Sequence, residues 1–323
     1  MNAPASSRPH PTLPAKVLIA VDASSASQHA VAYARTLVAP GGEVRLVSIA
    51  ENPRTLVPMG TLVAAALDSA RAELARDADE ALAKAREVFA GKDVRVDTAV
   101  IDLSKVGGNI VHALIDAAQT WQADLIVVGA RQHRGLLRWV EGAVSEPLAR
   151  LSHCPILIVP SAYSIKPDRL PEHILFAVDG SRHAEDALQY GMRFAAHDTE
   201  LMAVYVVDRA VRLTDFVPID VLEDAFIEEG QQALAAAKTL LAAASDQVAT
   251  RLAETERTGD DIAHTIVREA DHWNADLIVM GTHGRRGMAR WMLGSVAERV
   301  ARLAHAPLLL VHSAEGRRLN AER

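Results

Sequence analysis

A glycine-rich segment in the second half of the chain has the residue types and spacing that could hold a phosphate. Two residues separate Gly281 from Gly284, nine separate Gly284 from Gly294, and Ser295 comes next. Glycines let the backbone turn sharply and approach a phosphate with no Cβ atom in the way. A helix beginning at Gly294 would direct its first N–H groups at the anion. The Ser295 hydroxyl could bind a phosphate oxygen and also cap that helix.

Charged side chains stand beside the same segment. His283, Arg285 and Arg286 can add positive charge within the loop. Asp179 follows an apolar run earlier in the chain, where it could contact a ligand, cap the next helix, or do both. For the glycines and Ser295, the alternative is a tight turn and a helix cap without a ligand. Because all four occur between a predicted strand and a predicted helix, phosphate binding is the better interpretation.

The elements that must position this loop alternate between short apolar runs and amphipathic stretches. The apolar runs predict strands over 174–178, 201–207, 248–254, 277–281 and 308–311. Helical spacing predicts helices over 184–195, 221–244, 262–273 and 296–303. Strands that alternate with helices predict a parallel sheet with helices on both faces, and ligands of such folds bind outside the carboxyl ends of the strands.

The first half of the chain repeats this plan. A stretch of 37 residues from Ala123 aligns without gaps with one from Ala275, with 20 identities, and VLIAVDAS at Val17 matches ILFAVDGS at Ile174. The first copy is therefore predicted to have strands over 17–21, 44–49, 94–101, 125–129 and 156–159 and helices over 26–38, 62–89, 110–121 and 143–151. Residues 161–171 contain several prolines and predict an extended linker. Residues 1–15 are predicted to be a disordered tail, and residues 314–323 a second tail.

The glycine spacing, together with AVDGS at the first strand and DLIVMGTHGRRG at the fourth, resembles the universal stress protein family. The resemblance covers residues 16–160 and 172–313, as in the tandem members of that family. It implies two Rossmann-like (adenine nucleotide alpha hydrolase-like) domains, each a five-stranded parallel sheet with helices on both faces. It also implies that ATP, with Mg²⁺, is held between the end of the first strand and the glycine loop.

The family's ATP contacts, carried over residue by residue, fall in the second copy. The residues that would border the adenine and ribose or pack on the base are Ala177, Val178, Asp179 and Val206. The residues that would enclose the ribose and phosphates are Met280, Gly281, His283, Gly284 and Arg285. The β- and γ-phosphates would be held by Gly294, Ser295 and Val296. Ala297 departs from the family pattern, in which a second hydroxyl is frequent, and is expected to weaken the site.

The first copy departs further from that pattern. Gln132 stands in the place of Gly284, and Ala143 in the place of Ser295. Gln132 brings a side chain to a position where the backbone should approach the ligand, and Ala143 removes the hydroxyl. Glu141 adds a negative charge that should repel a phosphate. We therefore predict that the first domain does not bind ATP in the family manner.

The composition disfavours several other classes of protein. No apolar run approaches the roughly 18 residues that span a bilayer, and the first residues lack the apolar core of a secretory signal. The net charge of −7 disfavours non-specific nucleic-acid binding. Cys154 is the only cysteine, so an internal disulfide is excluded and a reducing compartment, the cytoplasm, is predicted. Cys154 itself is expected to be a small buried residue. The histidines show no metal-ligand spacing, so no metal site is predicted.

Three functions stay open. The first is a regulatory protein of the stress response, in which ATP bound to the second domain shifts its conformation or partner binding. The second is a slow ATPase or self-phosphorylating enzyme, with Ser295 as acceptor and Asp179 holding Mg²⁺. No acidic residue lies between Gly281 and Ser295, so this hypothesis predicts at most weak ATP hydrolysis. The third is a nucleotide-free interaction scaffold. We favour the first.

The resemblance also bears on assembly. Members of the family commonly pair through the last strand of the sheet. This implies a pairing of residues 156–159 with 308–311 within the chain, since an exposed apolar strand edge is a liability unless it is covered. A homodimer is a further expectation. The protein partner, and the choice among ATP, AMP and a cyclic nucleotide, are not predicted.

Overall fold

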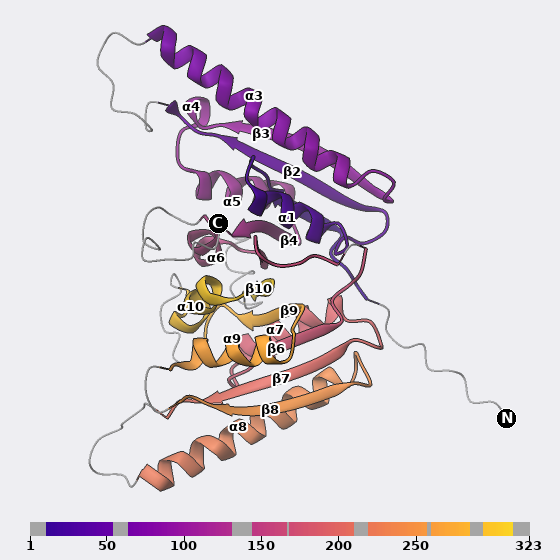
Figure 1. Ribbon diagram of the computed structural model, residues 1–323, viewed down its shortest axis with the longest axis vertical. Coiled ribbons are helices and arrows are strands. Elements are labelled where there is room, and N and C mark those ends of the chain that lie inside the picture. Colours follow the sequence, from indigo (N-terminus) through magenta and orange to yellow (C-terminus); the bar gives the residue numbers. More distant parts are fainter. Residues whose placement is uncertain are drawn as a thin grey trace, which may run out of the picture. The chain divides into compact units, whose positions relative to one another are not determined.

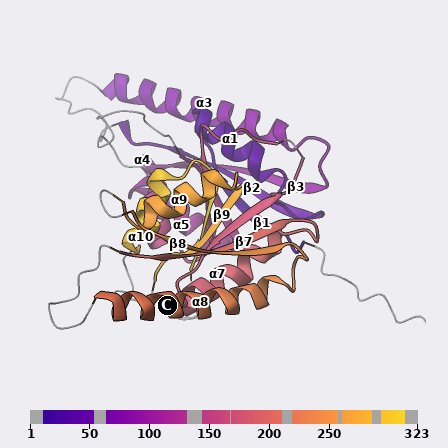
Figure 2. The ribbon, with the colours of Figure 1, turned by 60° about the horizontal axis from the view of Figure 1, so that its bottom comes forward.

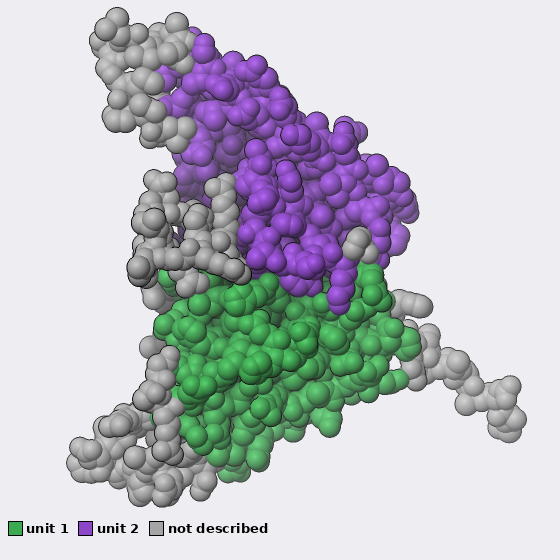
Figure 3. Space-filling model, viewed as in Figure 1, with its two compact units in different colours: residues 1–13, 169–323 green, residues 14–168 purple. Residues whose placement is uncertain are grey.

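The computed structural model describes residues 11–53, 64–130, 144–166, 168–209, 219–256, 260–284 and 293–312. The chain divides into two compact units (Figure 3). The first domain comprises residues 14–168, and the second comprises residues 169–323 together with residues 1–13. Among the described residues, no helix is long and apolar enough to cross a membrane.

The first domain is a five-stranded parallel sheet with helices on both faces (Figure 1). Its strands are β1 (Lys16–Ala20), β2 (Gly42–Ala50), β3 (Val94–Asp102), β4 (Leu125–Ala130) and β5 (Ile156–Pro160), in the sheet order β3-β2-β1-β4-β5. Its helices are α1 (Ser25–Ala34), α3 (Ala64–Val88), α4 (Leu103–Val106), α5 (Ile110–Trp121) and α6 (Ser145–Leu151). Helices α1 and α3 contact each other, as do α5 and α6, so each pair covers one face of the sheet.

The second domain repeats the same arrangement. Its strands are β6 (His173–Ala177), β7 (Glu200–Val207), β8 (Val248–Glu254), β9 (Leu277–Gly281) and β10 (Leu308–Val311), in the order β8-β7-β6-β9-β10. Its helices are α7 (Arg182–Gly191), which continues into the short 3-10 helix η1 (Met192–Phe194), α8 (Ile219–Leu241), α9 (Ile262–His272) and α10 (Ser295–Leu303). Helices α7 and α8 lie on one face of this sheet, and α9 and α10 lie on the other (Figure 2).

Apolar residues buried on both faces explain the central strands. Val17, Leu18 and Ile19 in β1 are fully buried, as are Leu277, Ile278 and Val279 in β9. A strand covered by helices on both sides needs a continuous apolar run rather than alternation. The predicted α/β fold, with its parallel sheets and two domain repeats, is confirmed.

The two domains begin their sheets with the same hydrogen bonds. Asp124 Oδ2 accepts the N–H groups of Ala15 at 3.1 Å and Lys16 at 2.9 Å. In the second domain, Asp276 Oδ2 accepts those of Glu172 at 3.0 Å and His173 at 3.1 Å. Each aspartate belongs to an Ala-Asp-Leu triplet that the two copies share. The shared triplet is therefore a structural device at the amino ends of the strands.

Several details differ from the sequence-based expectations. Helix α1 ends at Ala34, four residues before the predicted end, because Leu37 N–H bonds back to the Ala34 carbonyl at 2.9 Å in a tighter turn. The short helix α4 was not predicted; Asp102 caps it by accepting the N–H of Ser104 at 2.8 Å. Cys154 is half-buried, so the prediction that it is buried is wrong.

The predicted tail and linker make defined contacts where they are described. The Thr12 carbonyl accepts Arg193 Nε at 2.8 Å. Asp168, near the end of the linker, pairs with Lys92 at 2.9 Å and with Arg35. Hydrogen bonds from Lys92, and to a smaller extent from Arg35, hold the pKa of Asp168 below its ordinary value. Thr12 is therefore attached to the second domain and Asp168 to the first.

Candidate functional site

The carboxyl ends of β6, β7 and β9 lie side by side in the second domain. Parallel register places Ala177 opposite Val204, and Phe176 opposite Val279. The predicted contacts at the strand ends therefore meet at one edge of the sheet. Among them, Ala177 and Val206 are half-buried and accessible to a ligand. Val178 and Met280 are buried, with 8% and 6% of their surface exposed, so they can offer little more than backbone atoms.

Asp179 and Gly284 face each other across this edge. One carboxylate oxygen of Asp179, Oδ1, accepts the N–H of Ser181 at 3.0 Å. The other, Oδ2, would lie 2.7 Å from a Cβ atom at Gly284. Only glycine leaves room for this approach without a shift of the carboxylate. The glycine at 284 thus allows the loop to approach the acidic group at the end of β6.

The helix after β6 is capped by a different residue. Ser181 is the N-cap of α7, and its Oγ accepts the N–H of Ala184 at 3.2 Å. The alternative that Asp179 caps this helix is therefore wrong. Asp179 instead forms a turn two residues ahead of the cap, and its half-buried carboxylate can contact a ligand.

Helix α10 starts at the loop with its first turn uncapped by a side chain. Gly294 is the N-cap, and its N–H bonds to the Thr282 carbonyl at 2.8 Å. Ser295 is the first helical residue and is exposed, so the prediction that it caps α10 is wrong. The N–H groups of the first helical turn have no acceptor within their own helix, and Gly294 brings no side chain to supply one. Ser295 and the half-buried Val296 lie where these groups could bind an anion.

Gly281 has a packing role that explains its residue type. A Cβ atom there would lie 3.0 Å from the backbone carbonyl group of His183, so β9 and α7 are in close contact. In the first domain, Gly129 makes the equivalent approach, and a Cβ atom would lie 2.3 Å from the carbonyl group of Ala26. The glycine at this place serves the fold in both copies.

Thr282 and His283 connect the loop to its surroundings. The Thr282 N–H bonds to the Val311 carbonyl at 3.0 Å, which holds the loop beside β10. Thr282 Oγ1 lies 3.1 Å from His283 Nδ1. Thr282 is buried and was not among the predicted site residues. Its position between two glycines of the loop was the one available signal.

The remaining residues singled out in the sequence fall partly outside the described residues. Arg285 and Arg286 lie outside the described residues, as do Gln132, Glu141, Gly142 and Ala143 of the first domain. Ala297 is described and buried, with 2% of its surface exposed. Ser145 takes its place in the first domain and is also buried, at 7%. Among the described residues, no group of three metal-ligating side chains is found.

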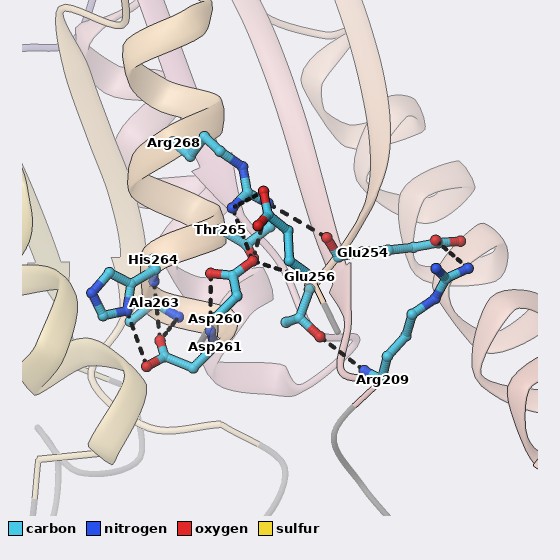
Figure 4. A network of polar contacts seen from close by, with 10 residues as sticks. Arg209, Glu254, Glu256, Asp260, Asp261, Ala263, His264, Thr265 and Arg268 are labelled. Carbon is cyan, nitrogen blue, oxygen red and sulfur yellow. Dashed lines mark hydrogen bonds and ion pairs between the residues drawn. The ribbon is translucent and has the colours of Figure 1, made fainter. Parts of the chain in front are cut away.

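A polar network fastens the end of β8 to α9 beside this edge (Figure 4). The Asp260 carboxylate accepts the N–H of Glu256 at 2.8 Å, Thr265 Oγ1 at 3.0 Å and an Arg268 N–H at 2.8 Å. Partial burial raises the pKa of Asp260, but these hydrogen bonds outweigh burial and lower the pKa to about 2. The next residue, Asp261, caps α9 and pairs with Arg299 on α10 at 2.9 Å. The Asp261–Arg299 pair thereby connects the network to α10, the helix that follows the glycine loop.

The strand order and the helices on both faces of the sheet recur in the two domains, so the protein consists of two Rossmann-like α/β domains. The family model of the universal stress protein family matches residues 15–160 and 171–312, so the chain belongs to that family. A universal stress protein from Mycolicibacterium smegmatis is 28% identical over 91% of this chain and 96% of its own. One from Methanocaldococcus jannaschii is 35% identical over 45% of this chain and 84% of its own. The solved structure of a universal stress protein from Archaeoglobus fulgidus shares the fold, with a TM-score of 0.62 and 18% identity over 92% and 96% of the two chains.

Proposed function

We propose that this protein binds ATP, with Mg²⁺, at the carboxyl edge of its second domain and acts as a nucleotide-dependent regulator in the stress response. The observation that carries the proposal is the start of α10. Its N-cap, Gly294, has no side chain to satisfy the first N–H groups of the helix. Such a helix start favours an anion. The family membership adds an expectation of an adenine nucleotide at this edge.

The other predicted residues would each contact a different part of the nucleotide. Ala177, Asp179 and Val206 would meet the adenosine part, because they are accessible at the ends of β6 and β7. His283 and Gly284 would border the ribose and phosphates. Ser295, exposed on the first helical turn, would bind a phosphate oxygen. Arg285, outside the described residues, is proposed as a further phosphate contact from its place in the loop.

Thermal unfolding with and without Mg-ATP tests the proposal. The variants are Ser295→Ala and the double variant Gly284→Gln/Ser295→Ala. The double variant gives the second domain the residues that the first domain has at these two positions. At about 100 times Kd, one site stabilises the folded protein by about 2.7 kcal/mol. We expect this in the wild type, less of it in Ser295→Ala, and none in the double variant. Ser295→Ala is the cleaner change, because a glutamine side chain at position 284 would also displace Asp179.

The reverse double variant, Gln132→Gly/Ala143→Ser, is the matched control and should respond to Mg-ATP at least as strongly as the wild type, because it leaves the second domain unchanged. Equal stabilisation of the wild type and the Gly284→Gln/Ser295→Ala variant would place the nucleotide elsewhere. No response to ATP, ADP, AMP or cyclic AMP in any variant would favour the nucleotide-free scaffold. ATP turnover measured in parallel separates a regulator from an enzyme. Homodimer formation stays a prediction that sedimentation equilibrium can measure.

A further inference from the structure

A second histidine stands next to the loop. His183 lies in the first turn of α7, and its ring centroid is 5.4 Å from that of His283, with the rings tilted by 44°. The backbone of His183 is held in place from two sides. Its carbonyl packs against Gly281 at the end of β9, and Ser181 caps the helix just before it. The backbone that carries the His183 side chain is therefore held by packing against β9 and by the helix cap.

His283 is close both to His183 and to the start of α10. Besides the contact of its Nδ1 with Thr282 Oγ1 at 3.1 Å, its Cα atom lies 3.6 Å from the position of a Cβ atom on Gly294. A group that binds at the first turn of α10 would thus reach the neighbourhood of the His283 ring. Imidazole can donate a hydrogen bond to a phosphate oxygen. Because Nδ1 faces Thr282 Oγ1, Nε2 is the nitrogen that would donate, and the orientation of the His283 ring decides whether Nε2 points at the phosphate.

The two copies differ at both histidines. Ala26 aligns with His183, and Arg131 aligns with His283. The close approach of helix and strand is kept in the first domain, where Gly129 packs against Ala26. Packing of the helix therefore does not require a histidine at this place. The choice of histidine at position 183 is therefore not explained by the packing of α7 on β9.

We propose that His183 is a positioning residue of the nucleotide site, whose ring holds the His283 imidazole where it donates a hydrogen bond to a phosphate of the bound nucleotide. The proposal rests on the proposed function, because it needs a nucleotide at this edge. His183 would then contribute only to the binding of the phosphate groups. Adenosine, which has no phosphate, should not sense a change at this residue.

Titration calorimetry with Mg-ATP and with adenosine tests this assignment. We expect His183→Ala to weaken ATP binding about tenfold, the size of one lost hydrogen bond to a charged group, and to change adenosine binding less than about twofold. His183→Phe keeps a ring beside His283 and should restore most of the affinity for ATP. In a His283→Ala background, His183→Ala should have no further effect, because its target is gone.

His173→Ala is the matched control. This histidine also contacts a ring, with its centroid 5.2 Å from that of Trp273, but it lies at the amino end of β6. The His173→Ala change should leave the affinities for Mg-ATP and for adenosine unchanged. Equal losses for ATP and adenosine in His183→Ala, or an undiminished effect in the His283→Ala background, would overturn the positioning role. A wild type that binds no ATP would instead refute the proposed function itself.

Discussion

The two domains share contacts at both ends of their first strands and differ in sequence within the glycine loop and at Asp260. Asp124 and Asp276 hold the first strands in the same way, and Ser24 and Ser181 cap the helices that follow them. Near the carboxyl edge, Asp260 of the second domain aligns with Gly108, and Gly284 and Ser295 of the glycine loop align with Gln132 and Ala143 of the first copy. Residues that only one copy retains are candidates for function, whereas a residue that both copies retain, such as Asp179 with its counterpart Asp22, has to be tested in each domain.

The largest expected effect concerns a glycine that both copies retain. In Gly129→Ala, the new Cβ atom would lie 2.3 Å from the Ala26 carbonyl group, whereas in Gly281→Ala it would lie 3.0 Å from that of His183. Backbone atoms cannot move aside as a flexible side chain can. We expect Gly129→Ala to lower the free energy of unfolding of its domain by about 3 kcal/mol, and Gly281→Ala by about 1 kcal/mol.

Amide hydrogen exchange, followed by peptide in each domain, measures both losses without assuming a single unfolding step. The untouched domain of each variant serves as the internal control. Equal losses in the two variants would mean that the helices approach their strands equally closely, contrary to the difference described above.

The Asp260 network should make the second domain more sensitive to acid than the first. The pKa of Asp260 in the folded domain, about 2, lies below its ordinary value of 3.8. A carboxylate with a lowered pKa stabilises the fold fully above the ordinary value, and this contribution is lost as the pH falls through about 4 toward 2. The shift corresponds to about 2 kcal/mol.

Asp260→Asn tests this contribution. We expect the second domain to lose about 2 kcal/mol at pH 7 and to differ much less from the wild type near pH 2.5, in urea unfolding followed by amide exchange. The first domain should be unaffected at either pH. Asp246→Asn, a change at an exposed aspartate elsewhere in the second domain, is the control for the loss of a charge. A loss at pH 7 that persists in full at low pH would assign the effect to packing.

The paired aspartates after the first strands offer a test of function. Asp179 Oδ2 faces the loop at Gly284, while the counterpart Asp22 accepts the N–H of Ser24 at 2.8 Å and also its hydroxyl. We expect Asp179→Asn to weaken Mg-ATP binding about tenfold, the loss of one charged hydrogen bond, and Asp22→Asn to have no effect. Titration calorimetry with Mg-ATP on both variants measures the two affinities. A loss in Asp22→Asn would mean that the first domain carries the nucleotide.

The sequence predicted the sheets well because strands buried on both faces are continuous apolar runs. Strand β9 and helix α5 begin and end where periodicity placed them. The duplication strengthened every assignment, since a pattern in one copy could be checked in the other. Helix α4 escaped because it is one short turn set by the Asp102 cap, which no periodicity can reveal.

The candidate site was predictable only in part. Glycine spacing located the loop, but it could not distinguish Gly281, which packs against α7, from Gly284, which leaves room for Asp179. That distinction depends on contacts between residues about 100 positions apart in the chain. His183 escaped for the same reason, because nothing near it in the sequence points to His283.

The smallest expected effect distinguishes the contribution of a helix cap from that of an ion pair. The comparison uses equivalent positions in the two domains. Asn109 caps α5 and Asp261 caps α9, each by accepting the N–H of the histidine three residues later at 3.0 Å. Asp261 also pairs with Arg299, whose side chain is 57% exposed, and such pairs contribute little. We expect Asp261→Ala and Asn109→Ala to cost about 1 kcal/mol each, and Asp261→Asn less than about 0.5 kcal/mol. Urea unfolding with amide exchange compares the three variants. Because asparagine already forms this cap in the first domain, a large loss in Asp261→Asn would show that the charge, and not the cap, holds α9 and α10 together.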